Sequence, residues 1–403
     1  MSAAHRLANV ESALNCRDDD VVIVSACRTA VGRARKGGFK DTNPTDLLAT
    51  VLRGVISRVQ FPASKVDDVV VGNVLLPGAG ATQARMAMLL AGLPQETSVQ
   101  AVDRQCSSGL QAIAACAAAI AAGQVDVAIG AGVESMSLGK MGDVGPISEV
   151  AMANDKAKQC TIPMGITSEN VAERYGIGRE EQDRFAVESN HKAIAAQKAG
   201  KFVAEIVPVT ATVKDASGGK NQVVVEADEG PRATTYEQLA KLKPSFKPNG
   251  CSTAGNSSQM SDGAAAVLLM KRKTAKTMGL PVLATFRSFA VAGCSPDVMG
   301  IGPIYAIPRA LEKAGVGIRD VDVFEINEAF ASQCLYSAKH LGIPMEKLNP
   351  LGGAIALGHP LGCTGCRQVV TLVHELRRRG KGRGVVSMCI GTGMGAAAVL
   401  EVE

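Results

Sequence analysis

Cys106 is the residue of this chain whose surroundings best suit a nucleophile. It stands directly before Ser107, Ser108 and Gly109, and a long alanine-rich run without charged residues follows. Either serine can cap a helix start, so Cys106 would face unpaired backbone N–H groups and the positive end of a helix dipole. Both favour thiolate over thiol. Since most free cysteines are small core residues, position alone supports the nucleophile and the core interpretation about equally.

Three further groups in the C-terminal third could take part in chemistry. His359 lies in a loop rich in Gly and Pro at 352–365, and Asn327 ends an apolar strand where the chain must turn. Cys389 follows another apolar strand and opens the sequence CIGTGMG. A glycine-rich turn after a strand exposes backbone N–H groups that can hold an anion. A dinucleotide fingerprint would have to open a helix, whereas a strand is expected here, so that interpretation is weak.

The bulk composition indicates a large intracellular α/β protein. The 403 residues suffice for two or three domains, and 43 glycines with only 3% aromatic residues suit closely packed α/β layers. The net charge of +5 is spread along the chain and does not indicate nucleic-acid binding. Eleven scattered cysteines are not a secreted disulfide framework, so we predict a reducing compartment. We predict no metal site, no permanently bound cofactor, no secretory signal and no membrane span.

A pair of cysteines and the alanine-rich run each have more than one interpretation. Cys363 and Cys366 form a lone CxxC pair, for which core or surface packing is favoured over zinc or redox chemistry. The run at 106–123 is long enough to cross a membrane, but alanine is weakly apolar and Gln, Ser and Gly interrupt the run. We therefore predict a helix that is buried on every face.

Strand and helix patterns alternate along the N-terminal part. Apolar runs predict buried strands, helical periodicity separates them, and the alternation predicts a parallel-rich sheet covered on both faces. The expected strands cover 21–28, 67–74, 98–102 and 126–132, and the expected helices cover 45–59, 82–92 and 106–123.

The same order of elements recurs in the C-terminal part, which indicates an internal duplication. Asn73 aligns with Asn327 and Cys106 with His359, at separations of about 254 residues, and the hexapeptide GAAAVL occurs at 263–268 and again at 395–400. The strand at 127–132 is aligned with 385–390. We therefore predict two homologous α/β halves. Because equivalent positions of such halves meet at the shared interface, Cys106 and His359 should face one pocket.

The position of the two hexapeptides locates an insertion in the first half. The predicted division is a tail or targeting segment at 1–20, a first half at 21–135 plus 261–281, an inserted domain at 136–260, and a second half at 282–403. The insertion carries helical patterns at 168–175 and 179–199, a polar segment at 214–222, and a basic run with Lys241, Lys243, Lys247 and, nearby, Arg232. These cations could meet phosphates, although such runs are more often solvated surface.

Four motifs in order along the chain resemble the thiolase family. They are QCSSG around Cys106, NEAF with Asn327, GHP with His359, and CIGTGMG with Cys389, and the resemblance extends over nearly the whole chain from Val21. It implies duplicated five-stranded α/β halves in an α-β-α-β-α arrangement with an inserted loop domain. It also implies CoA-dependent cleavage of 3-oxoacyl-CoA to acetyl-CoA and a shortened acyl-CoA, with acyl-CoA and CoA as substrates and a homodimer or tetramer as the assembly.

The resemblance also implies a role for each motif residue. Cys106 is the acyl-carrying nucleophile, and Cys389 is the acid/base cysteine. His359 and Asn327, the latter through a water, build one oxyanion hole, and the backbone N–H groups of Cys106 and Gly391 build a second. A thiolate suits attack on a ketone, and two cysteines can differ in role through their environments. Our hypothesis is that Cys106 rests as thiolate and Cys389 as thiol.

Within the family, the chain resembles the degradative, peroxisomal branch. The residue before Met164 is Pro163, where biosynthetic members carry His, and the loss of that imidazole should leave room for longer acyl chains. The resemblance places Met164 at the acyl pocket and Arg232 and Ser258 at CoA-contacting positions. The alternatives are a biosynthetic acetoacetyl-CoA thiolase, a decarboxylating ketoacyl synthase, and a catalytically idle lipid-binding member. The last should have lost one of the four groups, and none is lost.

The N-terminal tail partly resembles a peroxisomal type-2 import signal, which would make an import receptor a partner. Arg6 and Leu7 are followed, after five residues, by Ala13 and Leu14, whereas the signal has His or Gln in place of Ala13. We predict the peroxisomal matrix as the location, with mitochondrion and cytosol as alternatives.

Overall fold

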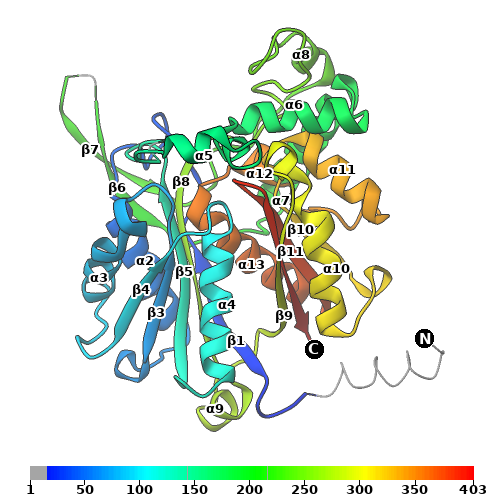
Figure 1. The fold of residues 1–403 in the computed structure, drawn as a ribbon. Helices are drawn as coiled ribbons and strands as arrows, with labels where there is room; N and C mark the ends of the chain where they lie inside the picture. The colour runs from blue at the N-terminus through cyan, green and yellow to red at the C-terminus, as the bar shows by residue number, and fades with distance from the viewer. Residues whose placement is uncertain (1–15, 143, 216) are drawn as a thin grey trace, which may run out of the picture.

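A long mixed β-sheet runs through the molecule and carries helices on both faces (Figure 1). The computed structural model describes residues 16–142, 144–215 and 217–403. The predicted import signal, with Arg6, Leu7, Ala13 and Leu14, lies outside the described residues. No helix of the described chain is long and apolar enough to cross a bilayer.

The first half alternates strands and helices as its apolar patterns predict. Asn43 caps α2 by accepting a hydrogen bond from Thr45 N at 2.9 Å, and Pro44 takes the first helical position, where no donor is lost. Its elements are β1 (Val21–Arg28), β2 (Gly32–Arg33), α2 (Pro44–Ser57), β3 (Asp68–Gly72), α3 (Ala81–Leu90), β4 (Ser98–Val102), α4 (Ser108–Ala121), β5 (Val127–Ser135), β8 (Ser261–Lys271) and α9 (Arg272–Thr277).

The second half repeats this order without the insertion. Its elements are β9 (Ala284–Gly293), α10 (Gly302–Ala314), β10 (Val323–Ile326), α11 (Ala331–Leu341), α12 (Ala354–Leu357), α13 (Leu361–Arg378), β11 (Gly382–Ile390) and β12 (Met394–Val402). Five strands were expected in each half. The second has four, because the segment that would correspond to β4 is reduced to a single bridge between Phe324 and Leu348.

The sheet is mixed rather than parallel-rich. Its order is β10-β11-β12-β9-β1-β8-β5-β3-β4, and the two halves join where β1 pairs with β9 at Val22 and Ile23. Only β3 with β4, β3 with β5, and β10 with β11 run parallel. The alternating pattern failed to show this because the last strand of each half returns antiparallel, β8 after the insertion and β12 after a tight turn.

The pairing registers confirm the duplication and correct one of its alignments. Glu134 pairs with Gly263, and Cys389 pairs with Gly395, the two glycines that open the GAAAVL copies. Strands β5 and β11 thus correspond at 389 − 134 = 255 residues, so the predicted match of 127–132 with 385–390 is wrong by three residues. Runs of small apolar residues match in several registers, and only the ladder hydrogen bonds select one.

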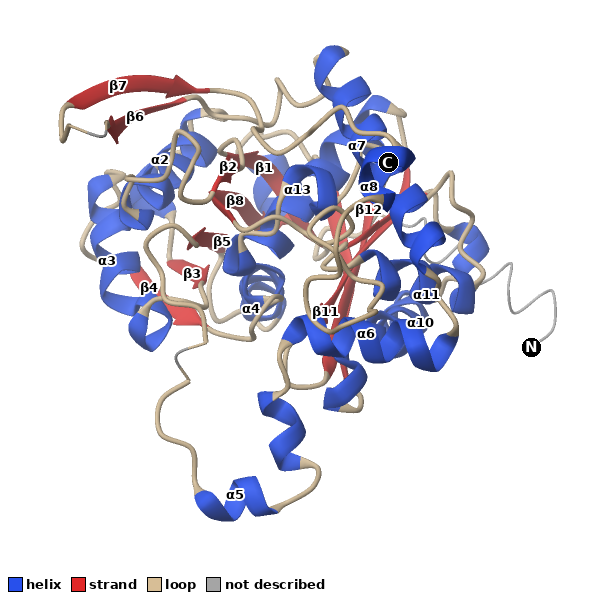
Figure 2. Cartoon of the chain, turned by 90° about the horizontal axis from the view of Figure 1, so that it is seen from above, coloured by secondary structure: helices blue, strands red, loops and turns tan. Residues whose placement is uncertain are grey.

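The two equivalent helices α4 and α13 pack against each other in the middle of the molecule, as predicted (Figure 2). A Cβ atom added to Gly109 would lie 2.6 Å from Gly362 O and 2.9 Å from Cys366 N, so this approach requires glycine. Helix α4 is not buried on every face, because Ala118 is exposed. Cys363 and Cys366 are both buried in the core around these helices, as the packing interpretation predicted.

The segment between β5 and β8 lies outside the sheet and covers one end of it. It contains α5 (Glu149–Ala153), α6 (Met164–Tyr175), α7 (Arg179–Lys198), β6 (Val209–Lys214), β7 (Lys220–Val225) and α8 (Tyr236–Ala240). The α5 region extends away from the body in the view from above (Figure 2). The polar segment at 214–222 covers the turn of the β6–β7 hairpin and the strand residues beside it, which the sequence did not predict.

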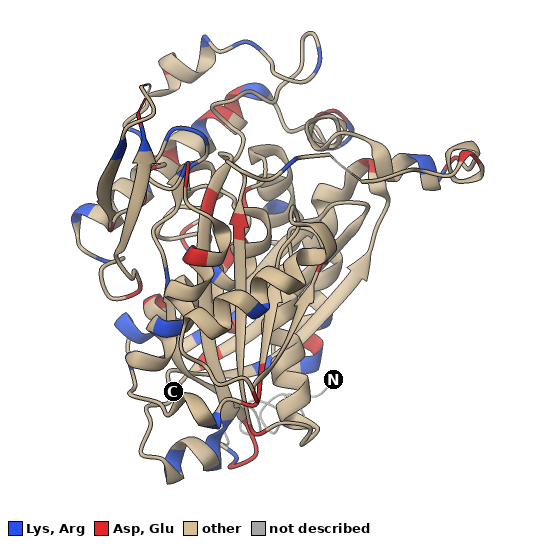
Figure 3. Ribbon diagram, turned by 90° about the vertical axis from the view of Figure 1, so that its left-hand side faces the viewer, with Lys and Arg blue, Asp and Glu red and all other residues tan. Residues whose placement is uncertain are grey.

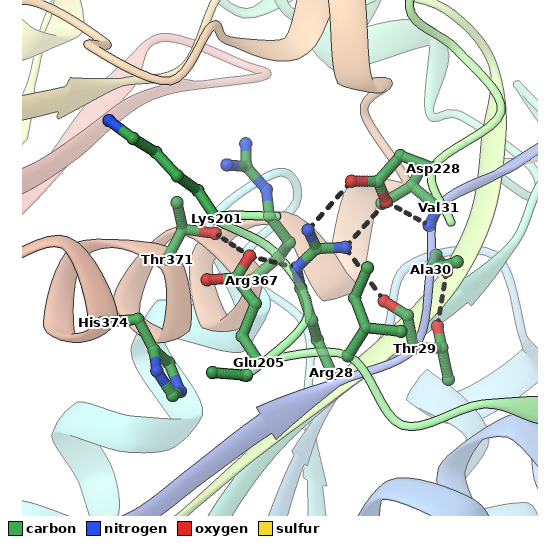
Figure 4. Close-up of polar contacts among 12 residues, drawn as sticks. Arg28, Thr29, Ala30, Val31, Lys201, Glu205, Asp228, Arg367, Thr371 and His374 are labelled. Atoms are coloured by element: carbon green, nitrogen blue, oxygen red, sulfur yellow. Dashed lines mark hydrogen bonds and ion pairs between the residues drawn. The ribbon is translucent and has the colours of Figure 1, made fainter. Parts of the chain in front are cut away.

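A buried ionic cluster ties this insertion to both halves (Figure 4). Arg28, at the end of β1, donates to Glu205 Oε1 at 2.7 Å and to both oxygens of Asp228 at 2.7 and 2.9 Å. Glu205 also accepts a hydrogen bond from Thr371 Oγ1 of α13 at 3.0 Å. Arg28 and Glu205 are fully buried, so each charge depends on its partners for compensation.

Basic and acidic residues are interspersed along the helices, strands and loops (Figure 3). Near the base of β9 and β12, Arg287 lies 3.1 Å from Asp20 and 2.6 Å from Glu401. The residues from 16 to 20, expected to be part of a tail, are thus attached to the second half through Asp20 and to α9 of the first half through Asp18 and Lys276.

Candidate active site

Cys106 lies in the short connection between β4 and α4, on a backbone in an uncommon conformation. The preceding residue, Gln105, has φ of 49°, and both serines that were expected to cap the helix bond to the loop instead. Ser107 Oγ donates to Arg104 O at 3.0 Å, and Ser108 Oγ donates to Gln105 O at 2.6 Å and accepts from Arg104 N at 2.9 Å. The helix start therefore keeps N–H groups without a side-chain cap, and the serines shape the cysteine loop.

The electrostatic environment of Cys106 opposes the expected resting thiolate. Burial raises the pKa of its thiol to about 11, and this outweighs the N–H groups of Gly391 and of Cys106 itself, which lower that pKa. The charges of Asp103 and Glu134 raise it further. The surroundings of Cys106 thus favour the thiol, because desolvation exceeds the stabilisation that the N–H groups supply.

The Gly391 N–H joins the second half of the chain to the nucleophile. Gly391 follows β11 in a turn with Thr392 at φ 70° and Gly393 at φ 97°. The turn brings the Gly391 N–H within hydrogen-bonding reach of the Cys106 thiol. The two groups predicted to form one oxyanion hole, the N–H groups of Cys106 and Gly391, therefore do converge on one sulfur atom.

His359 is buried and held by both ring nitrogens. Nδ1 lies 2.6 Å from Thr364 Oγ1, and Nε2 lies 3.3 Å from Asn327 Nδ2. Its backbone N–H donates to Gln259 O at 3.0 Å. Burial, followed by the positive charge of Arg367, lowers the pKa of His359 to about 3, so the imidazole is neutral at physiological pH.

Asn327 is fixed by its backbone and leaves one polar atom free. Its N–H donates to Ser387 O at 2.9 Å, and its carbonyl accepts from Gln333 Nε2 at 2.7 Å. Within the described residues its Oδ1 atom is buried without a hydrogen-bond partner. A buried amide oxygen without a partner is costly, so the site is suited to a bound water or substrate atom there.

Cys389 is the next-to-last residue of β11 and lies in an apolar cluster with Met299, Ala329 and Phe330, against which Met164 also packs. Its thiol is fully buried, and burial raises its pKa well above the ordinary value. The charge of Cys106 adds to this rise. Met164 opens α6 and reaches Gly391, whose added Cβ would lie 3.8 Å from its sulfur. The structure thus brings both cysteines, Gly391 and Met164 together.

The two residues expected to contact CoA have different positions relative to this centre. Ser258 lies beside the Asn327 segment, with its N–H donating to Ala329 O at 3.0 Å. Arg232 is exposed, and its backbone N–H donates to Asn190 Oδ1 at 3.0 Å. Lys247 of the basic run is paired with Glu173 at 2.7 Å.

Two residues around the site escaped the sequence analysis. Thr364 holds His359 Nδ1, and its position five residues after the histidine, in the same loop and helix, could have indicated it. Glu134 is the structural equivalent of Cys389, and the duplication would have revealed it in the correct register. No cluster of three or more His, Cys, Asp or Glu suited to a metal ion is present among the described residues.

Family models and known relatives match nearly the whole chain. The thiolase N-terminal domain matches residues 21–273, and the thiolase C-terminal domain matches residues 280–402. The chain is 60% identical to peroxisomal 3-ketoacyl-CoA thiolase B of Rattus norvegicus over 95% of this chain and 91% of the relative. It is 59% identical to the peroxisomal 3-ketoacyl-CoA thiolase of Homo sapiens, with the same shares of the two chains covered.

Solved structures give the same assignment. The dimeric peroxisomal thiolase of Saccharomyces cerevisiae superposes with a TM-score of 0.91 at 48% identity, over 98% of this chain and all of that one. Human mitochondrial 3-ketoacyl-CoA thiolase in complex with CoA superposes with a TM-score of 0.86 at 38% identity, over 96% of this chain and 98% of that one.

Proposed function

The chain belongs to the thiolase family, and we propose that it is a degradative 3-ketoacyl-CoA thiolase that cleaves 3-oxoacyl-CoA with CoA in the last step of fatty-acid β-oxidation. The single observation that carries this proposal is the convergence of groups from both halves on Cys106. The Gly391 N–H reaches its sulfur, and Cys106 is close enough to Cys389 for its charge to raise the pKa of that second thiol. A structural core cysteine would not need donors from a separate, strained turn.

The first step forms a bond between Cys106 sulfur and C3 of the substrate. Cys106 exchanges its proton with water, and the thiolate in equilibrium with the favoured thiol attacks the ketone, whose π electrons move to the oxygen and form an alkoxide. Hydrogen-bond donors that are already in place stabilise such charge strongly, each by roughly 3–4 kcal/mol. The N–H groups of Cys106 and Gly391 are suited to this task, since both act on the Cys106 sulfur.

The second step breaks the bond between C2 and C3. The alkoxide collapses to the acyl thioester on Cys106, and the bonding electrons pass to C2 as the enolate of acetyl-CoA. His359 and a water held by Asn327 stabilise the enolate oxygen, and the unpartnered Asn327 Oδ1 supports the water. Cys389 donates its proton to C2, which releases acetyl-CoA and leaves Cys389 as thiolate.

The third step transfers the acyl group to CoA. The Cys389 thiolate takes the proton of the incoming CoA thiol, and the CoA sulfur attacks the carbonyl of acyl-Cys106. The Cys106 thiolate leaves, so the shortened acyl-CoA is formed and both cysteines return to their starting protonation. The high pKa of buried Cys389 suits it to hold a proton between these events.

We extend the proposal to substrate contacts and domain roles. The inserted segment 136–260 serves as the CoA- and substrate-binding domain, with Arg232 and Ser258 toward CoA and Met164 toward the acyl chain. Pro163, which precedes α6 directly, leaves the space that an imidazole would fill, and this favours acyl chains longer than acetoacetyl. CoA acts as a substrate, and no permanently bound cofactor is required.

The assembly and location follow from the relatives. A relative from Saccharomyces cerevisiae is described as dimeric, so we propose a homodimer for this chain. Curated relatives from rat, human and Arabidopsis thaliana are named peroxisomal, and we propose the peroxisomal matrix for this protein as well. Recognition of the N-terminal tail by an import receptor is part of the proposal, despite Ala13 in place of His.

The proposal is tested by following the Mg²⁺–enolate absorbance of 3-oxoacyl-CoA as CoA is added. Wild-type protein should consume the substrate only in the presence of CoA, and Cys106→Ala should abolish turnover. Activity that survives in Cys106→Ala would overturn the assignment. Substrates of acetoacetyl, decanoyl and hexadecanoyl length separate the degradative enzyme from a biosynthetic one, which would accept only the shortest.

A further inference from the structure

Glu134 is a buried carboxylate that the mechanism above does not use. It lies in β5 near its carboxyl end, is fully buried, and forms no ion pair with any described residue. Its compensation comes from four N–H groups. They are Asn73 Nδ2 at 3.0 Å, Val74 N at 3.1 Å, Leu75 N at 3.3 Å and Gly362 N at 3.0 Å.

One of these four donors belongs to the other half of the molecule. Gly362 is the second residue of α13, whose first turn also carries Thr364. Thr364 Oγ1 donates to Pro360 O at 3.0 Å and lies 2.6 Å from His359 Nδ1. A continuous series of contacts therefore runs from the Glu134 carboxylate through the first turn of α13 to the imidazole.

The start of α13 rests on the ends of two strands of the first half with no free space between them. A Cβ added to Gly362 would lie 2.6 Å from Asn73 Cα, and one added to Gly132 would lie 2.4 Å from Gly362 O. These contacts are with backbone atoms, so no flexible side chain could move aside if the start of α13 shifted slightly. The hydrogen bond from Gly362 N to Glu134 is a polar contact of this closely packed turn with the first half.

We propose that Glu134 is a positioning residue for His359, because its carboxylate fastens the first turn of α13, and with it Thr364, to the first half of the sheet. This inference rests on the proposed function, in which His359 stabilises the enolate. Burial raises the pKa of Glu134 to about 7, and its four hydrogen-bond donors lower that pKa, so the negative charge depends on them. A negative charge also suits the N-terminus of a helix. Retaining a buried carboxylate without a cation is costly, which is consistent with a specific task at this position.

An amide cannot replace this carboxylate. Oε1 accepts from Asn73 and Leu75, and Oε2 accepts from Val74 and Gly362, so both oxygens act only as acceptors. In Glu134→Gln, an NH₂ group replaces either Oε1 or Oε2. Its hydrogens would then face two N–H donors, with which they cannot form hydrogen bonds. The anchor to Gly362, or the one to Asn73 and Leu75 directly after β3, would be lost with little change in side-chain size.

The test is a double-mutant cycle in the full-length protein, with steady-state thiolysis of 3-oxodecanoyl-CoA as readout. Glu134→Gln should lower kcat at least tenfold and leave the KM for CoA within twofold. In the His359→Ala background the same substitution should cause no further loss, because a residue that acts through His359 has nothing left to position. A merely structural role would lower activity by the same factor in both backgrounds.

The matched control is Asp67→Asn, near the opposite end of β5. Asp67 Oδ2 accepts from Asp126 N at 2.8 Å and Val127 N at 2.9 Å, so this carboxylate also binds backbone N–H groups. Its substitution should leave kcat within twofold. If Glu134→Gln yields no soluble protein, Glu134→Asp keeps the charge, withdraws it by one methylene from Gly362, and should show the same cycle.

The outcomes separate the two proposals. Wild-type activity in His359→Ala would overturn the function assigned to that residue. Suppose instead that His359→Ala loses activity. If Glu134→Gln then leaves kcat unchanged, or lowers kcat by the same factor in both backgrounds, only the inference about Glu134 is overturned.

Discussion

Glu134 and Cys389 occupy the same place in the two halves of the sheet. Glu134 pairs with Gly263 and Cys389 with Gly395, the first residues of two identical hexapeptides, and both side chains are fully buried. In the first half, this position holds a carboxylate that anchors α13. In the second, it holds a thiol beside the nucleophile. Duplication thus provided two equivalent buried positions, of which we assign one to positioning and the other to proton transfer.

The pKa of Cys106 predicts how fast it reacts with iodoacetamide in the absence of substrate. Because burial raises that pKa to about 11, the alkylation rate should rise about tenfold per pH unit from pH 7 to pH 10. Mass spectrometry of the peptide that contains Cys106 separates it from the exposed Cys16 and Cys160. A rate that levels off below pH 8 would instead support a resting thiolate.

His359 should stay neutral throughout the working pH range. Its pKa is lowered to about 3, whereas an unfolded histidine titrates near 6.5, so the folded state opposes protonation and loses stability as pH falls below 6.5. ¹⁵N chemical shifts of the imidazole measured between pH 5 and pH 8 should remain those of the neutral ring. A titration midpoint near 6.5 for His359 would contradict the burial argument.

Asn327→Ala should lower kcat about 10²–10³-fold, the magnitude typical of losing one donor from an oxyanion site. The KM for CoA should stay nearly constant, because Asn327 is placed beside the reacting centre and not along the bound CoA. Asn221→Ala, on the exposed β6–β7 hairpin, is the control and should leave kcat unchanged. If Asn327→Ala changed kcat and the KM for CoA by similar factors, a role in substrate binding would be indicated instead.

Gly109→Ala should destabilise the protein by about 3 kcal/mol or more, through overpacking between α4 and α13. The added methyl group would meet Gly362 O at 2.6 Å, and rigid helix backbone cannot move aside. Gly178→Ala is the matched control, since its φ is −71° and no atom lies within 4 Å of the added Cβ. Urea denaturation of both variants measures the difference, and similar midpoints would refute it.

Arg28→Met should cost about 3–5 kcal/mol of stability, because it leaves Glu205 and Asp228 as buried charges without their cation. Lys158→Met breaks an exposed pair with Asp155 and should change stability by less than about 1 kcal/mol. Thermal unfolding compares them. A small effect at Arg28 would mean that water reaches the cluster around Glu205.

The structure confirms what local and periodic patterns predicted. Helix boundaries lie within a few residues of the apolar periodicity, as at α2 (Pro44–Ser57) and α7 (Arg179–Lys198), because capping residues and apolar spacing are local signals. Whether neighbouring strands run parallel or antiparallel was less predictable. Whether β8 runs parallel or antiparallel to β5 depends on where the chain goes after Ser135, and no local pattern carries that information.

The sequence by itself determined the duplicated α/β plan, the family and the four residues that should carry the chemistry. It could do so because motif residues and repeated hexapeptides are readable along one dimension. Only the tertiary structure decided the register of β5 against β11, the partners of His359, and the protonation of Cys106. These depend on distances between segments hundreds of residues apart and on desolvation, which raises the pKa of Cys106 although the helix start beside it favours the thiolate.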